Sequence, residues 1–392
     1  MEKQSGERNV LLYWLYVVFN EPLFWGPVVI ASLQKLAHMR LSEIYYMESA
    51  VVCICVVLDI PFGSLADLIG RKKCIIIGRI FLFGSATFFA LMTAPIHAWV
   101  GNVLWAIGLT MQNGADTALL SDTLNKNGKG NDYRRVQGRA IGSRYILIAF
   151  CSLLTGSFAG INLRLPVLLG LPFMLISLFT AFFFEEPART ERYSAGEHLD
   201  RLKQGISFVI HSVEVRWMIG FAALLATTSK VWFFTYNPYF ELVGLPLTQY
   251  GVIFFCLNMV AWWSSTYAYK IEQYLGERAC IVGMILCIGI PILLMGCLPF
   301  QPLAYLVIVQ NVVRGFMSPF VGGYVNRHLT ITIRATGLSA QSSIANVMAI
   351  VGLSAFGFFT NTLGLLHSLV LLGIAALVIG MLSYATYARK IA

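Results

Sequence analysis

The sequence is built from long apolar segments that follow one another, separated by short polar connections. A helix of about 20 mostly apolar residues is long enough to cross the hydrocarbon core of a bilayer. Only 12% of the residues are charged and 57% are hydrophobic, whereas soluble domains carry about 25% charged residues. The sequence therefore excludes an ordinary soluble enzyme and predicts an all-α membrane protein that crosses the bilayer many times.

Twelve apolar segments of this kind can be delimited. They cover residues 10–31, 44–66, 74–93, 97–121, 140–160, 165–184, 216–239, 248–269, 279–298, 302–324, 337–361 and 366–388. We expect twelve transmembrane helices in two pseudo-symmetric bundles of six, the first in residues 1–184 and the second in residues 216–392. Residues 185–215 are polar, but apolar residues recur among them at helical spacing, which predicts a cytoplasmic linker with an amphipathic helix.

The Lys and Arg residues between the segments are concentrated in every second connection and at the two ends of the chain. The alternate connections carry only Lys35, Arg40 and Arg164. Because Lys/Arg-rich connections remain in the cytoplasm, we predict a plasma-membrane or bacterial inner-membrane protein with both termini cytoplasmic. The first segment is expected to be retained, because no small-residue cleavage site accompanies it. No nucleic-acid partner is expected, since the basic residues behind the net charge of +9 do not cluster on one soluble face.

The sequence lacks the patterns of a cofactor site or a catalytic site. The eight Cys are scattered without metal or disulfide spacing, and no phosphate loop or hydrolase constellation is recognisable. We therefore expect no metal, no cofactor and no enzymatic activity. The expected source of energy is an ion gradient. The expected partners are a small-molecule substrate, protons and the lipid bilayer, with the chain acting as a monomer.

The two halves of the sequence share short matches, displaced by about half the chain. Residues 139–142 (RAIG) are similar to residues 334–337 (RATG), and residues 112–113 (QN) recur as residues 310–311. Parallel repeats of six helices around a site near the bilayer midplane are a transporter architecture. The repeats therefore favour a transporter.

The connection after the second segment reads GSLADLIGRKK over residues 63–73. It resembles the signature loop GxLaDrxGRkk of the major facilitator superfamily, which lies between that family's second and third helices. The matching residues are Gly63, Asp67, Gly70, Arg71 and Lys72. Glycine allows close helix approach and tight turns, and the resemblance implies that this loop locks one gating state. Over the whole chain it implies two bundles that rock about a central cavity and give alternating access.

Three features set the chain apart from the usual drug:proton antiporters of that family. Leu68 replaces a basic residue of the loop, and Asn102 stands where many of those antiporters have an Arg in the fourth helix. The fifth segment lacks a clear Gly-Pro motif between residues 142 and 160. The chain thus resembles a branch related to drug:proton antiporters, for which the usual proton route is not implied.

Four charged residues stand out inside the apolar segments, with Glu21 in the first, Asp116 in the fourth, Lys230 in the seventh and Arg314 in the tenth. A charged side chain at mid-bilayer costs about 2.5 to 3.5 kcal/mol, which makes each one a functional candidate. The resemblance implies that these four helices line the central cavity. We expect Glu21 and Asp116 to carry protons and all four residues to contact substrate.

Polar and aromatic residues lie at helical spacing from these charges. The further residues that we expect to bind substrate are Trp25, Gln112, Asn113, Phe233, Phe234, Gln310 and Asn311. The sequence Asn20-Glu21-Pro22 is expected to interrupt its helix. In an alternative interpretation, the two acids pair with the two bases as structural or gating bridges without touching substrate. Asp59 and Arg79, near the cytoplasmic ends of their segments, are expected to form a structural pair.

The first functional hypothesis is proton-driven export of an amphipathic or zwitterionic compound. Protonation of Glu21 or Asp116 from outside would release the cargo or free Lys230 and Arg314. The second hypothesis is proton-coupled import of an anionic or zwitterionic nutrient or metal chelate, which two cavity bases suit. A third, from another class, is a membrane receptor that does not transport.

Overall fold

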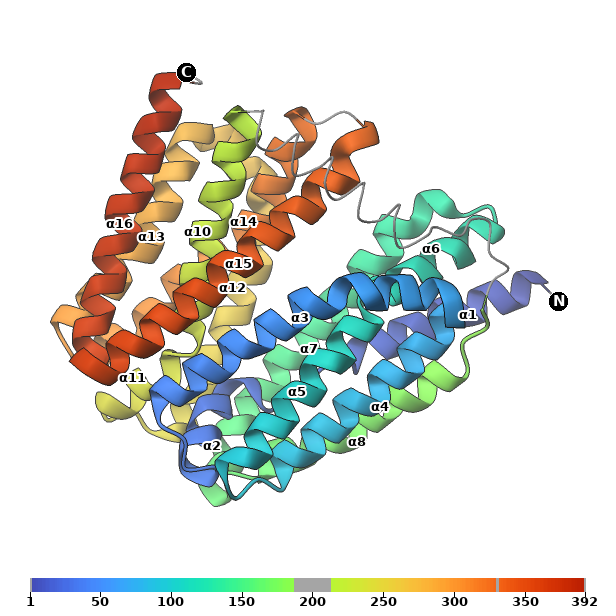
Figure 1. Cartoon of the computed structure of the whole chain (residues 1–392), viewed down its shortest axis with the longest axis horizontal. Helices are drawn as coiled ribbons and strands as arrows, with labels where there is room; N and C mark the ends of the chain where they lie inside the picture. The colour runs from blue at the N-terminus through green and yellow to red at the C-terminus, as the bar shows by residue number, and fades with distance from the viewer. Residues whose placement is uncertain (1, 187–212, 329–330, 391–392) are drawn as a thin grey trace. The chain divides into compact units, whose positions relative to one another are not determined.

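The structure is a computed structural model that describes residues 2–186, 213–328 and 331–390 (Figure 1). Within these residues the regular elements are helices. The first part of the chain forms α1 (Glu2–Val18), η1 (Gly26–Val28), α2 (Val29–Leu36), α3 (Leu41–Ile69), α4 (Arg71–Ala90), α5 (Pro95–Gln112), α6 (Ala115–Lys126), η2 (Gly130–Asp132), α7 (Tyr133–Ile161) and α8 (Leu165–Phe182). The second part forms α10 (Val213–Phe233), α11 (Tyr236–Leu242), α12 (Leu247–Leu275), α13 (Glu277–Cys297), η3 (Gln301–Leu306), α14 (Val307–His328), α15 (Ile331–Leu363) and α16 (Leu365–Lys390).

These helices coincide with the twelve predicted segments, although not every segment is one straight helix. Eight described helices are long and apolar enough to cross a membrane. The number is nine if the helices Arg216–Phe233 and Tyr236–Leu242, which are bent by 46° relative to each other, are counted as one span. The remaining predicted segments correspond to α1 with α2, to α5 with α6, and to α12. The predicted amphipathic helix of the linker lies outside the described residues.

The chain divides into two compact units. Unit 1 comprises Met1–Met39 and Ile54–His198, and unit 2 comprises Arg40–Cys53 and Leu199–Ala392. The beginning of α3 therefore packs with unit 2 and its remainder with unit 1. Within unit 1, α4 packs against α5 and α8, and α1 packs against α7 and α8 (Figure 1). Within unit 2, α13 packs against α16, α12 against α14 and α10 against α15.

Three of the predicted segments are interrupted next to polar residues. The first breaks after Val18, as the Asn20-Glu21-Pro22 sequence predicts, and the chain resumes helical structure at Gly26. The fourth breaks at Asn113 and Gly114, where Gly114 has a φ of 81° that favours glycine. The seventh breaks after Phe233. The sequence analysis treated the last two as continuous helices, and candidate site residues lie at or next to all three breaks.

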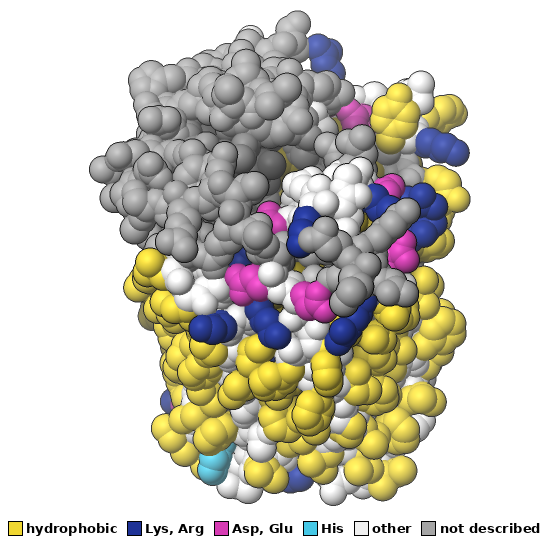
Figure 2. Space-filling view, turned by 90° about the vertical axis from the view of Figure 1, so that its right-hand side faces the viewer, with side chains coloured by type: hydrophobic (Ala, Val, Ile, Leu, Met, Phe, Trp, Pro, Cys, Tyr) yellow, Lys and Arg dark blue, Asp and Glu magenta, His cyan; other side chains and the backbone are white. Residues whose placement is uncertain are grey.

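Charged and hydrophobic side chains are segregated on the surface that Figure 2 shows. Among the described residues, Lys, Arg, Asp and Glu gather in the upper part of this face, and hydrophobic side chains cover most of the lower part. This distribution is typical of a protein whose apolar surface contacts lipid acyl chains while its charged connections lie in the aqueous phase.

Candidate functional site

A cavity of about 450 Å³ lies within unit 2, between α10, α11, α13 and α14. The structure brings together here six residues that the sequence analysis selected: Lys230, Phe233, Phe234, Gln310, Asn311 and Arg314. Apolar residues complete the wall, among them Ile288 and Ile292 of α13. None of the described residues that line this cavity is acidic, so its charge is basic.

The polar side of the cavity is organised by Asn311, which is 2% exposed. Its Nδ2 donates to the hydroxyl of Tyr236 at 3.1 Å and to the carbonyl of Val307 at 3.0 Å. Its Oδ1 accepts from Nη1 of Arg314 at 3.4 Å. Asn311 thereby positions Tyr236 and the exposed guanidinium of Arg314 on the cavity wall.

Gln310 precedes Asn311 in the sequence but, within the described part of the chain, lacks comparable hydrogen bonds. It is 4% exposed, yet neither its Oε1 nor its Nε2 has a hydrogen-bond partner among the residues that the structure describes. The same holds for Nε1 of Trp232, which also lines the cavity and is 1% exposed. A buried polar group without a partner costs about 1 to 3 kcal/mol, so these two side chains are a source of unused hydrogen-bonding capacity in the wall.

Aromatic rings form the apolar part of the cavity wall. Phe233 contacts Phe234, Tyr236 and Phe254 edge to face, with ring centroids 5.5, 6.0 and 6.2 Å apart. Trp232 contacts Tyr236 at 5.5 Å in the same geometry. Such clusters offer flat, apolar surfaces to a ring-containing ligand. The cavity therefore combines an aromatic wall with a guanidinium.

In unit 1, Glu21 lies in the break that follows α1 and forms an ion pair with Arg144 of α7, with an oxygen–nitrogen distance of 3.1 Å. The side chain of Glu21 is 45% exposed and that of Arg144 is 16% exposed. The sequence analysis missed Arg144. The signal was present, because Arg144 is a charged residue inside the apolar segment 140–160 and meets the same criterion that selected Glu21.

Asp116 is half-buried in the first turn of α6, where its Oδ1 accepts from the backbone N–H of Thr117 at 2.6 Å. Asn113, in the break between α5 and α6, is exposed and lies near the carboxylate of Asp59. Asp59 therefore has a polar neighbour other than Arg79. The expected Asp59–Arg79 pair is wrong, because Arg79 is bound elsewhere.

Arg79 is 1% exposed and is held by the break in α1. Its Nη1 donates to the carbonyl oxygen of Asn20 at 2.9 Å, to the Oδ1 of Asn20, and to Oε1 of Gln112 at 3.5 Å. The hydroxyl of Tyr16 also donates to Oε1 of Gln112, at 2.8 Å, and Arg79 lies 5.7 Å from the centroid of the Tyr16 ring. Gln112 thus belongs to a buried network, and Trp25 is likewise buried, with its ring centroid 4.4 Å from that of Phe89.

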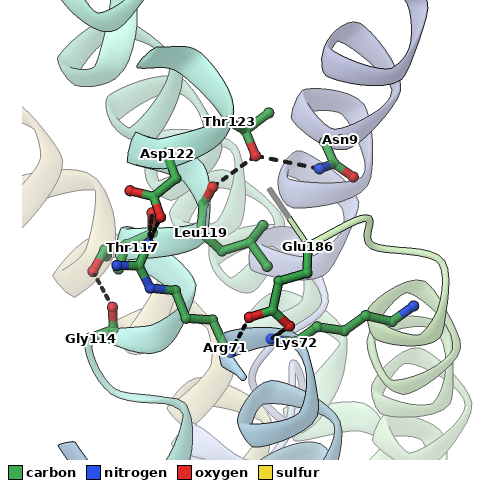
Figure 3. Close-up of polar contacts among 10 residues, drawn as sticks. Asn9, Arg71, Lys72, Gly114, Thr117, Leu119, Asp122, Thr123 and Glu186 are labelled. Atoms are coloured by element: carbon green, nitrogen blue, oxygen red, sulfur yellow. Dashed lines mark hydrogen bonds and ion pairs between the residues drawn. The ribbon is translucent and has the colours of Figure 1, made fainter. Parts of the chain in front are cut away.

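The signature loop joins α3 to α4 and is held at its C-terminal side (Figure 3). Gly70, with a φ of 110°, precedes α4, and Arg71 forms an ion pair with Asp122 of α6 and donates to the carbonyl of Ala118 at 3.0 Å. A Cβ on Gly63 would meet nothing within 4 Å, so the close helix approach expected there does not occur among the described residues. The side chain of Asp67 lies outside the described residues.

The chain that follows α8 is fastened to the same region (Figure 3). The carboxylate of Glu186 accepts from the backbone N–H groups of Arg71 at 2.7 Å and Lys72 at 3.3 Å, at the N-terminus of α4. Asn9 of α1 exchanges two hydrogen bonds with the backbone of Glu185, at 2.8 and 3.0 Å. A carboxylate at a helix N-terminus satisfies N–H groups that have no partner within the helix, so Glu186 anchors the start of the linker to unit 1.

Comparison with known proteins identifies the family of the chain. The sequence profile described as Major Facilitator Superfamily matches residues 11–300. Multidrug resistance protein 2 of Bacillus subtilis (strain 168) is 27% identical over 207 residues. That alignment covers 50% of this chain and 50% of the relative, so the chain spans about half the length of the curated protein it matches.

Solved transporter structures are similar over nearly the whole chain. A mutant of the nucleoside transporter NupG has a TM-score of 0.79 at 12% identity, with 99% of this chain and 100% of that chain covered. A bacterial homologue of the human lysosomal transporter Spinster has a TM-score of 0.77 at 15% identity, with 99% and 97% covered. A POT family transporter in complex with a thioalcohol-conjugated peptide has a TM-score of 0.77 at 13% identity, with both chains covered completely. The predicted fold of twelve helices in two bundles is thereby confirmed, and the chain belongs to the Major Facilitator Superfamily of membrane transporters.

Proposed function

We propose that this protein is a proton-coupled secondary active transporter that exports amphipathic or zwitterionic small molecules by alternating access. The observation that carries the proposal is the cavity in unit 2, which joins an aromatic wall to the guanidinium of Arg314. An aromatic wall accommodates an apolar body, and a guanidinium binds a carboxylate or phosphate through paired hydrogen bonds. The substrate class that fits both is a compound with a ring and an anionic group.

The ion pair between Glu21 and Arg144 supports proton coupling. Glu21 is accessible enough to exchange a proton with water, whereas Arg144 is mostly buried. Protonation of Glu21 removes the negative charge that compensates the guanidinium, and the partly buried guanidinium is then less stable, by a modest amount because water screens the pair. The two protonation states of Glu21 therefore favour different positions of α7 relative to the break that follows α1. Coupling to a proton gradient requires such a dependence of conformation on protonation. Asp116 is the second candidate proton carrier.

Export is favoured over import by the sequence similarity to Multidrug resistance protein 2. A second candidate function is proton-coupled import of an anionic or zwitterionic nutrient or metal chelate. The absence of acidic residues from the described lining of the cavity favours it, because Lys230 and Arg314 attract anions. Direction of transport separates the two functions.

The test uses inside-out membrane vesicles that are energised to be acid inside and then challenged with cationic, zwitterionic and anionic ring compounds. We expect zwitterionic and anionic compounds to dissipate the gradient in the wild type and in Glu7→Gln, but not in Glu21→Gln. Glu7 is a matched control because it is also an ion-paired glutamate, bound to Lys129 at 3.3 Å and 66% exposed. Import would be favoured if the compounds are taken up by right-side-out vesicles but do not dissipate the gradient of inside-out vesicles. Identical behaviour of wild type and Glu21→Gln in both assays would contradict proton coupling through Glu21 and favour the receptor.

A further inference from the structure

Asn311 of α14 joins three groups of unit 2 through one buried side chain. Its Nδ2 donates to the hydroxyl of Tyr236 at 3.1 Å and to the carbonyl of Val307 at 3.0 Å. Its Oδ1 accepts from Nη1 of Arg314 at 3.4 Å. A side-chain amide has two hydrogens to donate, and both are used within the protein. Asn311 therefore has no amide hydrogen left for a ligand while these bonds are made.

The groups that Asn311 connects have different surroundings. Arg314 is exposed and lines the cavity, where none of the described lining residues is acidic. Tyr236 is 5% exposed and is the first residue of α11, directly after the break in the seventh segment. Its ring stacks on Phe240 and contacts Trp232 edge to face. Asn311 thus links a guanidinium that a ligand can reach to the helix that follows the break.

The bond to Asn311 has an energetic consequence for ligand binding at Arg314. A long side chain that rotates freely loses conformational entropy when it binds a ligand. A contact that already restricts the guanidinium lowers this cost and raises the affinity. Orientation matters in particular for arginine, because its paired hydrogen bonds to a carboxylate or phosphate need a defined plane. Asn311 can impose an orientation because its own amide is fixed to the backbone of α14 and to Tyr236.

We propose that Asn311 and Tyr236 are positioning residues for the Arg314 guanidinium, so that the affinity for an anionic substrate depends on the link between α14 and α11. This inference rests on the proposed function, because it concerns how the same cavity holds the anionic group. Asn311 acts through Arg314 and does not touch the substrate. Movement of α11 at the break loosens the guanidinium, which gives the cavity a means of releasing the anion.

Two other roles of Asn311 make different predictions. If Asn311 only holds α11 against α14, its removal disturbs the whole cavity wall and weakens charged and uncharged ring compounds alike. If Asn311 touches the substrate, its removal weakens binding whether or not Arg314 is present. Positioning predicts a loss that is confined to anionic ligands and that disappears when Arg314 is replaced.

The experiment measures equilibrium binding of 2-naphthoate and 2-naphthamide to the purified full chain in detergent, by isothermal titration calorimetry. The two probes share one ring system, and only 2-naphthoate is an anion. Asn311→Leu replaces the amide by an apolar group of similar size and should weaken 2-naphthoate by about fivefold. Tyr236→Phe keeps the ring and should weaken it by about threefold, since Val307 still holds the amide. Neither variant should alter the affinity for 2-naphthamide.

A double-mutant cycle with Arg314→Gln tests whether the effect passes through the guanidinium. Arg314→Gln should weaken 2-naphthoate by about tenfold, and the addition of Asn311→Leu should cause no further loss. Asn258→Leu is the matched control. Asn258 of α12 is also buried, at 7% exposed, and also donates to the carbonyl four residues earlier, that of Phe254, at 2.8 Å. It is not among the lining residues of the cavity, so this variant should bind both probes like the wild type.

Equal weakening of both probes by Asn311→Leu would overturn the inference, and so would a fivefold loss that persists in the Arg314→Gln background. If Asn311→Leu does not fold, Tyr236→Phe takes its place in the cycle, and an unchanged affinity for 2-naphthoate would overturn the inference. Failure of the wild type to bind 2-naphthoate at millimolar concentration would contradict the substrate class of the proposed function, and the inference with it. Binding of 2-naphthoate that is independent of Asn311 would contradict the positioning alone.

Discussion

At the scale of single residues, the buried Arg79 and the partly buried Arg144 of unit 1 are compensated in different ways. Arg79 contacts no carboxylate among the described residues and is satisfied by the carbonyl and amide oxygens of Asn20 and by Gln112. Arg144 is compensated by the carboxylate of Glu21. The first arrangement depends on neutral oxygen atoms, whereas the second depends on a carboxylate. The break that follows α1 supplies Asn20 to the first arginine and Glu21 to the second.

The Glu21–Arg144 pair gives a test by a double-mutant cycle. Glu21→Gln and Arg144→Gln should each lower the free energy of unfolding by about 1 to 2 kcal/mol, a modest loss because Glu21 is 45% exposed and water screens the pair. The double variant should lose less than the sum of the two, since no uncompensated charge remains. The measurement is thermal unfolding of the purified protein in detergent. Additive losses would show that the two side chains are not energetically coupled.

At the scale of elements, glycine decides how closely two helices of unit 1 approach. A Cβ on Gly78 of α4 would lie 2.8 Å from the carbonyl oxygen of Gly108, and a Cβ on Gly108 of α5 would lie 2.7 Å from the carbonyl oxygen of Gly78. The two backbones are therefore in direct contact, as is common where small residues face each other in membrane helices. This contact fixes α5 beside α4 and places Gln112 within reach of Arg79.

Alanine substitutions on α4 test this contact. Gly78→Ala should destabilise the protein by about 1 to 3 kcal/mol, because the neighbouring atoms belong to the backbone and cannot rotate away. Gly84→Ala is the control on the same helix, since its Cβ would meet Leu104 at an ordinary 3.8 Å. That variant should be neutral or slightly more stable, because alanine favours helix. Equal melting temperatures of the two variants would contradict the close approach of α4 and α5.

At the scale of the whole molecule, the alternation of basic connections predicts the orientation in the membrane. Lys126 ends α6 and Lys129 lies in the connection that follows it, whereas the connection before α12 carries no Lys or Arg between residues 240 and 247. The first is expected to lie in the cytoplasm and the second outside. The same rule predicts that both termini, and the start of the linker at Glu186, lie on the cytoplasmic side.

Cysteine labelling in whole cells tests the orientation. In a chain whose eight native Cys are replaced, Asn125→Cys should react with a membrane-impermeant maleimide only after the cells are opened. Thr248→Cys should react in intact cells. Both positions are exposed and lie near the ends of their helices, so accessibility to the reagent depends on the side of the membrane. The reverse pattern of labelling would contradict the predicted topology.

The sequence alone determined the number of spans and the family, because long apolar segments and the GSLADLIGRKK loop are local signals that need no knowledge of neighbours. It also selected residues that share one cavity in unit 2, since Gln310, Asn311 and Arg314 lie on one helix and are grouped by helical spacing. The sequence did not predict which side chains pair across helices. The sequence paired Arg79 with Asp59 and left out Arg144, and it could not distinguish the fully bonded Asn311 from the unpartnered Gln310. Only the tertiary structure decided these points. Hydrogen-bond and ion-pair partners depend on where helices break and on how closely neighbouring helices pack, and the spacing of residues along one segment specifies neither.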